Sequence, residues 1–554
     1  MNVPAVLGRL TIEEKIGQMF MFGFPGTAPS PEIEEFIGRR AIGGVIYFAR
    51  NVTEVAQTAA LSERLQATAR DGRAALPLFV AADQEGGIVA RFTAASGAVR
   101  MPGNMLLGAA GDPSLTEAVA VAAGEQLAAC GVNVNLAPVL DVNVNPANPV
   151  IGGRSYGEDP AMVADHGAAA VRGYQKAGVM ATGKHFPGHG DTDVDSHLAL
   201  PVVPHQRDRL EAVELLPFRR AIAAGVAGIM TSHVFFPAIE PTPGLPATLS
   251  RRVLTGLLRR ELGFDGLVMT DCMEMKAITD NYPAGQAAVL AVKAGADLVL
   301  VSHTPERQAE SLDAVLAAVR RGDVDEGRVD ESVARILAHK ARYDVGRVSP
   351  PDRARATCGT AAQRELALRA AVSGVTLVRD RAGLIPVHRG SDARAAGITG
   401  IAGIAIIAVS PRPLSGVEDG AGGPTTTPPL ADALARAGLA ARGLHVNMRP
   451  APAEIERAAD LAGGAGVVVV ATVAAHRFPE QVGLVKRLLG SGRPTIIVAL
   501  REPYELARFP EAGSFLAAYD DSEPVIEAVA HILAGKDKAG GRLPVTIPGI
   551  DPAA

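Results

Sequence analysis

The densest group of polar side chains lies in residues 184–197, KHFPGHGDTDVDSH. Asp195 and His197 are two residues apart there, so both can face one site in a tight turn. A carboxylate that holds an imidazole fixes its tautomer and raises its basicity. Such a histidine suits general acid and base catalysis near neutral pH. Lys184 and His185 end a predicted strand, and we expect the rest of the segment to form a loop over the site.

Metal binding is the alternative interpretation of this segment. His185, His189 and His197 are ligand types that suit zinc or iron, but no H-E-x-x-H motif accompanies them. DTDVDS resembles the start of an EF-hand calcium loop, yet Ser196 stands where glycine is needed and Val202 where glutamate is needed. We therefore expect neither a metal ion nor a cofactor.

A second candidate is Asp271 in GFDGLVMTDCMEM, directly after an apolar run. A carboxylate at the end of a barrel strand can act as a nucleophile on the anomeric carbon of a sugar. The alternative is that Asp271 caps a helix beginning at MEMKAI, with Glu274 three residues on, as in a capping box. From the residues alone, both interpretations stay open.

Two further segments carry groups that can hold a sugar. In AADQEGGIVARF (81–92), Asp83 can accept hydrogen bonds from two hydroxyls, and Arg91 can donate a bidentate pair. In GGRSYGEDP (152–160), Arg154 stands beside glycines in a predicted loop, although an ordinary surface arginine is the alternative.

The elements that must position these residues alternate between short apolar runs and longer amphipathic segments, which is typical of β-α units around a parallel sheet. The predicted strands are 43–49, 78–83, 132–142, 179–186, 227–234, 266–271 and 297–303, with 19–24 as an eighth. Their carboxyl ends carry Asp83, Asp141, His185, His233 and Asp271. Such ends converge on one face of a (β/α)8 barrel, where active sites form. An open doubly wound sheet is the alternative.

A second α/β unit follows. Residues 347–363 are rich in Arg and Pro and interrupt the pattern, as a linker would. Apolar runs then recur at 374–380, 404–410, 467–473, 495–500 and 515–520, and 414–429 is a polar loop rich in Gly and Pro. We predict a (β/α)8 TIM-type barrel over residues 1–346, a linker over 347–369 and a smaller αβα sandwich over 370–554.

Composition sets the broad class of protein. The 554 residues are 48% hydrophobic and 20% charged, which excludes a disordered chain. The net charge of -5 gives no electrostatic reason to expect nucleic acid or a membrane surface as partner. The N-terminus does not resemble a secretory signal, and no apolar run is long enough to span a membrane. Three dispersed cysteines fit a reducing compartment, so we expect a cytoplasmic protein. A monomer or a homodimer is expected.

Taken together, the segments resemble glycoside hydrolase family 3. The resemblance rests on DQEGG (83–87), GRSYG (153–157), KHFPGHG (184–190), DSH (195–197), PATLS (246–250) and MTDCMEM (269–275), which occur in the family's order. KHFPGHG followed by DSH is similar to the β-N-acetylglucosaminidase branch, and GRLPVTIPG (541–549) resembles the end of the family's second domain. One departure is Cys272, where many relatives have an acid.

The resemblance implies a retaining mechanism. It makes Asp271 the nucleophile that forms a covalent glycosyl-enzyme, and it makes His197, held by Asp195, the acid/base in place of the usual glutamic acid. The residues that it places around the terminal sugar are Asp83, Arg91, Arg154, Lys184 and His185.

The expected function is therefore removal of terminal N-acetylglucosamine from muropeptides or chitin oligosaccharides. A β-glucosidase of the same family and a non-catalytic sugar-binding module are the alternatives. An imidazole, unlike a carboxylate, does not repel an incoming anion. Inorganic phosphate is accordingly expected as a second acceptor beside water, which would make the protein a phosphorylase as well.

Overall fold

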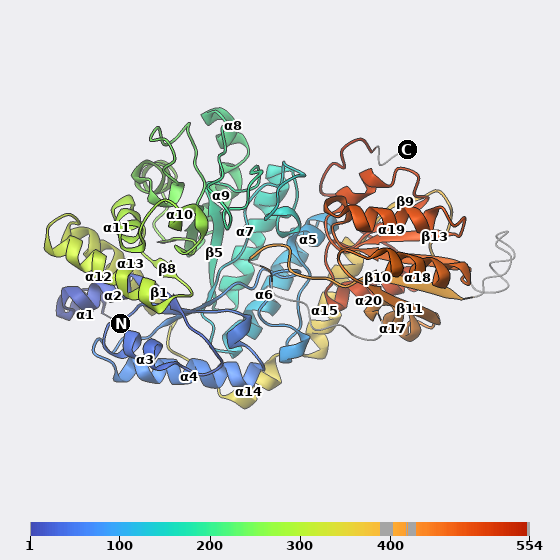
Figure 1. The fold of residues 1–554 in the computed structure, drawn as a ribbon. Helices are drawn as coiled ribbons and strands as arrows, with labels where there is room; N and C mark the ends of the chain where they lie inside the picture. Colours follow the sequence, from blue (N-terminus) through green and yellow to red (C-terminus); the bar gives the residue numbers. More distant parts are fainter. Residues whose placement is uncertain (1, 388–402, 417, 419–427, 551–554) are drawn as a thin grey trace.

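The computed structural model describes residues 2–387, 403–416, 418 and 428–550. Eight parallel strands form its first sheet, in the order β7-β6-β5-β4-β3-β2-β1-β8. Their bounds are β1 Phe20–Gly23, β2 Gly44–Tyr47, β3 Phe79–Ala82, β4 Val134–Asn135, β5 Met180–Phe186, β6 Gly228–Thr231, β7 Leu267–Met269 and β8 Val299–Val301. A parallel bridge between Met269 and Leu298 links the two ends of this order, so the sheet closes into a barrel (Figure 1).

Each of the eight predicted runs contains one of these strands, which confirms the barrel over the open sheet. The largest difference is β4, which spans two residues where eleven were predicted. Pro138 lies inside the predicted run and has no N–H to donate to a neighbouring strand. The chain continues alongside β5 from there, with a bridge between Val139 and Lys184.

The helices of the first domain surround the barrel. They are α1 Val3–Arg9, α2 Ile12–Gln18, α3 Pro31–Gly38, α4 Val55–Asp71, α5 Asn104–Ala110, α6 Pro113–Ala129, α7 Pro160–Lys176, α8 Arg207–Ala212, α9 Leu215–Ala223, α10 Lys276–Thr279, α11 Ala284–Ala294, α12 Pro305–Arg320 and α13 Glu326–Arg342. A π-helical stretch covers Arg252–Glu261, and short 3-10 turns occupy Ala49–Asn51, Ala94–Ser96, Gly152–Arg154 and Ala247–Leu249. Local signals set several helix starts, such as the reciprocal capping box of Thr11 and Glu14 at α2.

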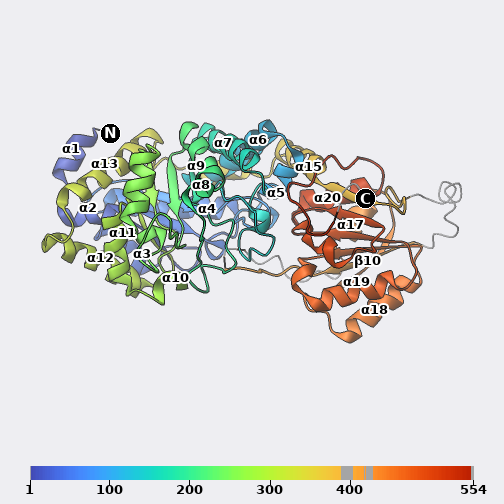
Figure 2. The ribbon, with the colours of Figure 1, turned by 90° about the horizontal axis from the view of Figure 1, so that it is seen from above.

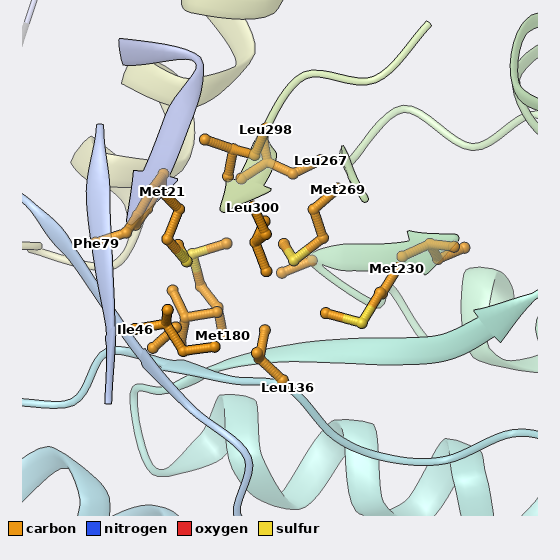
Figure 3. Packing of buried hydrophobic residues seen from close by; sticks show 14 of the residues in the cluster. Met21, Ile46, Phe79, Leu136, Met180, Met230, Leu267, Met269, Leu298 and Leu300 are labelled. Atoms are coloured by element: carbon orange, nitrogen blue, oxygen red, sulfur yellow. The ribbon is translucent and has the colours of Figure 1, made fainter. Parts of the chain in front are cut away.

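The barrel interior is a packed apolar core. Figure 3 shows its side chains meeting between the strands, among them Met21, Met180, Met269 and Leu300, all buried. Unbranched methionines fill irregular gaps between curved strands. Because the core is packed, the barrel is a rigid support for the side chains at the carboxyl ends of its strands.

The second sheet has six strands in the order β11-β10-β12-β13-β14-β9. Their bounds are β9 Thr376–Asp380, β10 Ile404–Val409, β11 Ala441–Val446, β12 Val467–Thr472, β13 Thr495–Ala499 and β14 Ser514–Ala517. Only β9 runs antiparallel, against β14. The sequence analysis missed β11, because ARGLHV is an edge strand whose residues are mostly half-buried and show no long apolar run.

Helices cover both faces of the second sheet, so this domain is an αβα sandwich beside the barrel (Figure 2). They are α15 Ala361–Gly374, α17 Pro429–Arg436, α18 Pro452–Gly463, α19 Pro479–Leu489 and α20 Glu523–Leu533, with 3-10 turns at Ala475–Arg477 and Pro503–Arg508. The segment predicted to be a linker contains α14 Pro351–Thr357, which packs on α4 and α6, and the first part of α15. Of the polar loop 414–429, residues 417 and 419–427 lie outside the described part. Within the described residues, every helix is too short or too polar to cross a lipid bilayer.

Candidate active site

The carboxyl ends of the barrel strands surround a cavity of about 540 Å³. Seven residues singled out from the sequence line it: Asp83, Arg91, Arg154, Lys184, His185, His197 and Asp271. The eighth, Asp195, is buried behind His197 and holds its ring. The cavity has a size typical of small-ligand sites, and charged groups surround it from several strands.

Asp271 stands two residues beyond the end of β7, where its side chain faces the cavity. It does not cap a helix: α10 begins at Lys276, and Asp271 Oδ1 accepts a hydrogen bond from the N–H of Cys272 at 2.7 Å. Burial alone would raise the pKa of Asp271, but the nearby imidazoles of His233, His185 and His197 outweigh burial and hold that pKa below its ordinary value. The group is therefore an anion at neutral pH, the form that a nucleophile needs.

His197 and Asp195 form a dyad on the loop after β5. Asp195 Oδ1 lies 2.7 Å from His197 Nδ1 and also accepts the N–H of His197 at 2.9 Å. Burial raises the pKa of Asp195, but these hydrogen bonds outweigh burial and lower it overall. A carboxylate on Nδ1 leaves Nε2 of His197 as the ring nitrogen available to substrate, and the side chain is 30% exposed. The arrangement suits proton transfer at the cavity mouth.

A chain of buried charges lies along another part of the cavity. Arg91 Nη2 lies 3.2 Å from Asp83, whose other oxygen accepts from Lys184 Nζ at 2.8 Å. Lys184 Nζ also lies 2.7 Å from Glu85. Glu85 in turn accepts two hydrogen bonds from Arg154, at 2.8 and 2.9 Å. Alternating charge lets five ionised groups share a site that is mostly closed to water, since each is paired.

This chain keeps its acids ionised. For both Asp83 and Glu85, burial would raise the pKa, but the facing cations outweigh it and lower the pKa overall. Burial would lower the pKa of Lys184, but Asp83 and Glu85 raise it. The chain of charges therefore presents fixed donors and acceptors, which is what recognition of sugar hydroxyls requires.

Glu85 was not singled out from the sequence. It lies beneath Lys184 and Arg154 and does not line the cavity, so its role is to neutralise them. The sequence did contain a signal for Glu85. The residues predicted around the terminal sugar include three cations, Arg91, Arg154 and Lys184, but only one acid, Asp83. Burying three positive charges on one carboxylate is unfavourable, and a further acid in DQEGG was the remaining candidate.

Two other polar residues at strand ends lie behind the cavity. Asp141 accepts His185 Nδ1 at 2.7 Å and the N–H of His189 at 2.6 Å, which fixes the His185 ring. His233 contacts Thr248 Oγ1 at 2.8 Å and the carbonyl of Cys272 at 2.9 Å, next to Asp271. Of the five polar residues predicted at strand ends, three therefore line the cavity, and Asp141 and His233 contact residues that do or that lie next to one.

On the metal alternative, the described residues contain no group of three or more His, Cys, Asp or Glu arranged to hold an ion. Both ring nitrogens of His189 are occupied, by Thr192 at 2.9 Å and by Ser196 at 3.0 Å. Burial lowers the pKa of His189 to about 4, so the ring is neutral and serves as a hydrogen-bonding link.

The outer wall of the cavity contains residues that the sequence analysis did not identify. Arg50 lies 4.3 Å from the ring centroid of Phe48 and 3.3 Å from His303 Nδ1. Glu274, first considered as part of a helix cap, accepts the N–H groups of His303 and Thr304 instead. Among the described residues of the second domain, Gly416 also lines the cavity.

Because Asp83 and Glu85 are both held ionised in the folded protein, its stability against unfolding depends on pH in a defined direction. The pKa of Glu85 is lower in the folded protein than the value of about 4.3 in an unfolded chain. Its contribution is therefore complete above pH 5 and is lost as the pH falls below that. We expect the melting temperature to fall as the pH is lowered from 5 to 3, and to fall less in Glu85→Gln.

At pH 7, Glu85→Gln should also be less stable by about 3 kcal/mol or more, because Lys184 and Arg154 lose their shared carboxylate. Differential scanning fluorimetry at several pH values measures both effects. The control is Glu456→Gln, which breaks an exposed ion pair with Arg487 and should leave the melting temperature unchanged. A Glu85→Gln protein that melts like the wild type at every pH would contradict this account of the buried charges.

Comparison with known proteins relates this chain to enzymes that act on carbohydrates. Residues 11–339 match the N-terminal domain of glycosyl hydrolase family 3. Beta-hexosaminidase A of Pseudoalteromonas piscicida is 33% identical over 97% of both chains. A β-N-acetylglucosaminidase/β-glucosidase of Cellulomonas fimi is 28% identical over 98% of this chain and 95% of its own. The solved family 3 β-N-acetylglucosaminidase of Paenibacillus sp. str. FPU-7 is 42% identical and superposes with a TM-score of 0.88 over 98% of this chain and 100% of its own.

Proposed function

This chain belongs to glycoside hydrolase family 3 and is a glycoside hydrolase, and we propose that it removes terminal β-linked N-acetylglucosamine with retention of configuration. One observation carries the proposal: an ionised aspartate just after β7 and a histidine that Asp195 holds on the loop after β5 line the same cavity. A nucleophile and a separate proton donor at one site are what a retaining glycosidase needs.

In the first step, a carboxylate oxygen of Asp271 attacks the anomeric carbon and forms a covalent glycosyl-aspartate. The bond from that carbon to the aglycone oxygen breaks, and His197 supplies the proton to this oxygen from Nε2. Asp195 stabilises the imidazolium before transfer and holds the ring in place.

In the second step, His197 accepts a proton from water as the water oxygen attacks the anomeric carbon. The ester bond to Asp271 breaks, the carboxylate is restored, and the sugar leaves with its original configuration. Lys184, Asp83 and Arg154 bind the sugar hydroxyls in both steps. Their ion pairs hold these side chains in place before the sugar arrives.

The substrate class follows from the relatives and from the shape of the site. The relatives described above are named as β-hexosaminidases and β-N-acetylglucosaminidases, one of them also as a β-glucosidase, and the chain covers nearly their full length. A cavity at the end of a packed barrel accepts a chain end better than an internal unit. We propose muropeptides or chitin oligosaccharides as the natural substrates, cleaved from the non-reducing end.

Two aryl glycosides that differ only in the sugar test the proposed substrate. We expect kcat/KM for the N-acetylglucosaminide to exceed that for the glucoside by at least about 100-fold, because a site that hydrogen-bonds a group discriminates strongly against its absence. Equal values would favour the β-glucosidase alternative. No turnover of either, with tight binding of N-acetylglucosamine by calorimetry, would favour the sugar-binding module.

A further inference from the structure

Arg477 is one of the residues through which the second domain contacts the barrel close to the candidate site. Arg477, in the 3-10 turn Ala475–Arg477, donates to the carbonyls of Asn148 at 2.9 Å and Pro149 at 3.2 Å. Both carbonyls belong to the barrel loop that leads to Arg154. Next to this contact, Glu502 of the second domain accepts the N–H of Gly153 at 3.2 Å.

Asn148 passes this contact on to the loop that carries the dyad. Its side-chain oxygen accepts the N–H groups of Val150 and Ile151, at 3.0 and 2.8 Å. Its side-chain amide donates to the carbonyls of His189 and Gly190, at 2.9 and 3.1 Å. Asn148 is 1% exposed, so water does not replace these bonds.

From His189 the link reaches Ser196, which lies between the two members of the dyad. His189 Nε2 lies 3.0 Å from the hydroxyl of Ser196, the residue between Asp195 and His197. The same loop is pressed against the barrel, since a Cβ at Gly190 would lie 1.8 Å from the carbonyl oxygen of Val142. One continuous series of hydrogen bonds therefore joins Arg477 to the residues beside the dyad.

We infer that Arg477 and Asn148 are positioning residues for the acid/base dyad, so that the second domain takes part in the reaction through them. The inference rests on the proposed role of His197. Neither residue lines the cavity, and both act through the loop of residues 189–197. A dyad displaced by a fraction of an ångström transfers its proton poorly even when the nucleophile stays in place.

The discriminating measurement is kcat/KM on two N-acetylglucosaminides, one with an alkyl leaving group that needs protonation and one with a dinitrophenolate that does not. For Arg477→Ala we expect a loss of about 10- to 100-fold on the first substrate and less than about threefold on the second. Arg477→Lys, which keeps one donor, should recover part of the loss. The control Arg449→Ala breaks an exposed ion pair with Glu480 in the same domain and should leave both values unchanged.

Asn148→Asp breaks the link at one point, because it keeps the acceptor for Val150 and Ile151 and replaces the donor to His189 and Gly190 with an oxygen that repels their carbonyls. It should show the same substrate dependence as Arg477→Ala, and the double variant should lose less than the product of the two single losses. Equal losses on both substrates, or an Arg477→Ala enzyme that behaves like Arg449→Ala, would overturn the inference.

His197→Ala separates this inference from the proposed function. If His197→Ala shows the leaving-group dependence and the Arg477 and Asn148 variants do not, the inference fails alone. If His197→Ala shows no such dependence, the acid/base assignment fails and the inference fails with it.

Discussion

Asparagine in place of Asp271 is expected to lower kcat by about 10⁴-fold or more, because the amide cannot form the glycosyl-ester intermediate. The structure supports so large an effect: Asp271 faces the cavity, and neighbouring imidazoles keep its pKa low. Asp271 Oδ1 accepts the adjacent N–H of Cys272 at 2.7 Å, and the amide oxygen of an asparagine can accept the same hydrogen bond. Steady-state assays with an aryl N-acetylglucosaminide measure the loss.

Two controls make this result specific. Asp280→Asn changes an exposed carboxylate nine residues further on and should retain wild-type kcat. Asp271→Asn should stay folded with a melting temperature only slightly below that of the wild type, since the amide loses the attraction of the nearby imidazoles but keeps the shape of the side chain. An Asp271→Asn enzyme with more than about a hundredth of wild-type kcat would remove Asp271 from the mechanism.

Alanine in place of His197 is expected to have an effect that depends on the leaving group. For an alkyl aglycone, which needs a proton, kcat/KM should fall by about 10³-fold. For a dinitrophenolate, bond cleavage should stay fast while hydrolysis of the intermediate becomes slow, because the base is missing. We expect dinitrophenolate release to begin with a burst equal in concentration to the enzyme and to continue as slow turnover.

Azide provides a second readout of the same variant, because this anion attacks the intermediate without base catalysis. Added azide should restore turnover of the activated substrate and yield a glycosyl azide of retained configuration. The matched control is His205→Ala, since His205 pairs with Asp191 on the same loop but does not line the cavity. A His197→Ala enzyme with neither a burst nor azide rescue would contradict the assignment of the acid/base.

Much of the site was predictable because barrel geometry converts sequence order into spatial proximity. Asp83, His185 and Asp271 lie far apart in the chain, yet each follows or ends a buried strand of a parallel barrel. Such positions meet at one face whatever the loops between them do. The dyad was predictable for a different reason, because Asp195 and His197 are close in sequence.

Features that depend on pairing between distant segments were not predictable. Arg477 and Asn148 are 329 residues apart, and nothing in either local sequence indicates the contact. The strand β11 was missed because its side chains are mostly half-buried at a sheet edge, so the apolar pattern that reveals the other strands is absent. The domain boundaries at residues 346 and 370 stay predictions.

The central claim is that Asp271 becomes covalently bound to the sugar. The most direct measurement is to mix His197→Ala with a dinitrophenyl N-acetylglucosaminide, stop the reaction in acid during the burst, digest the protein and sequence the peptides by mass spectrometry. The account predicts one added N-acetylhexosaminyl group on the peptide that contains Asp271, located on that residue. An unlabelled protein at full burst, or a label on another side chain, would contradict it.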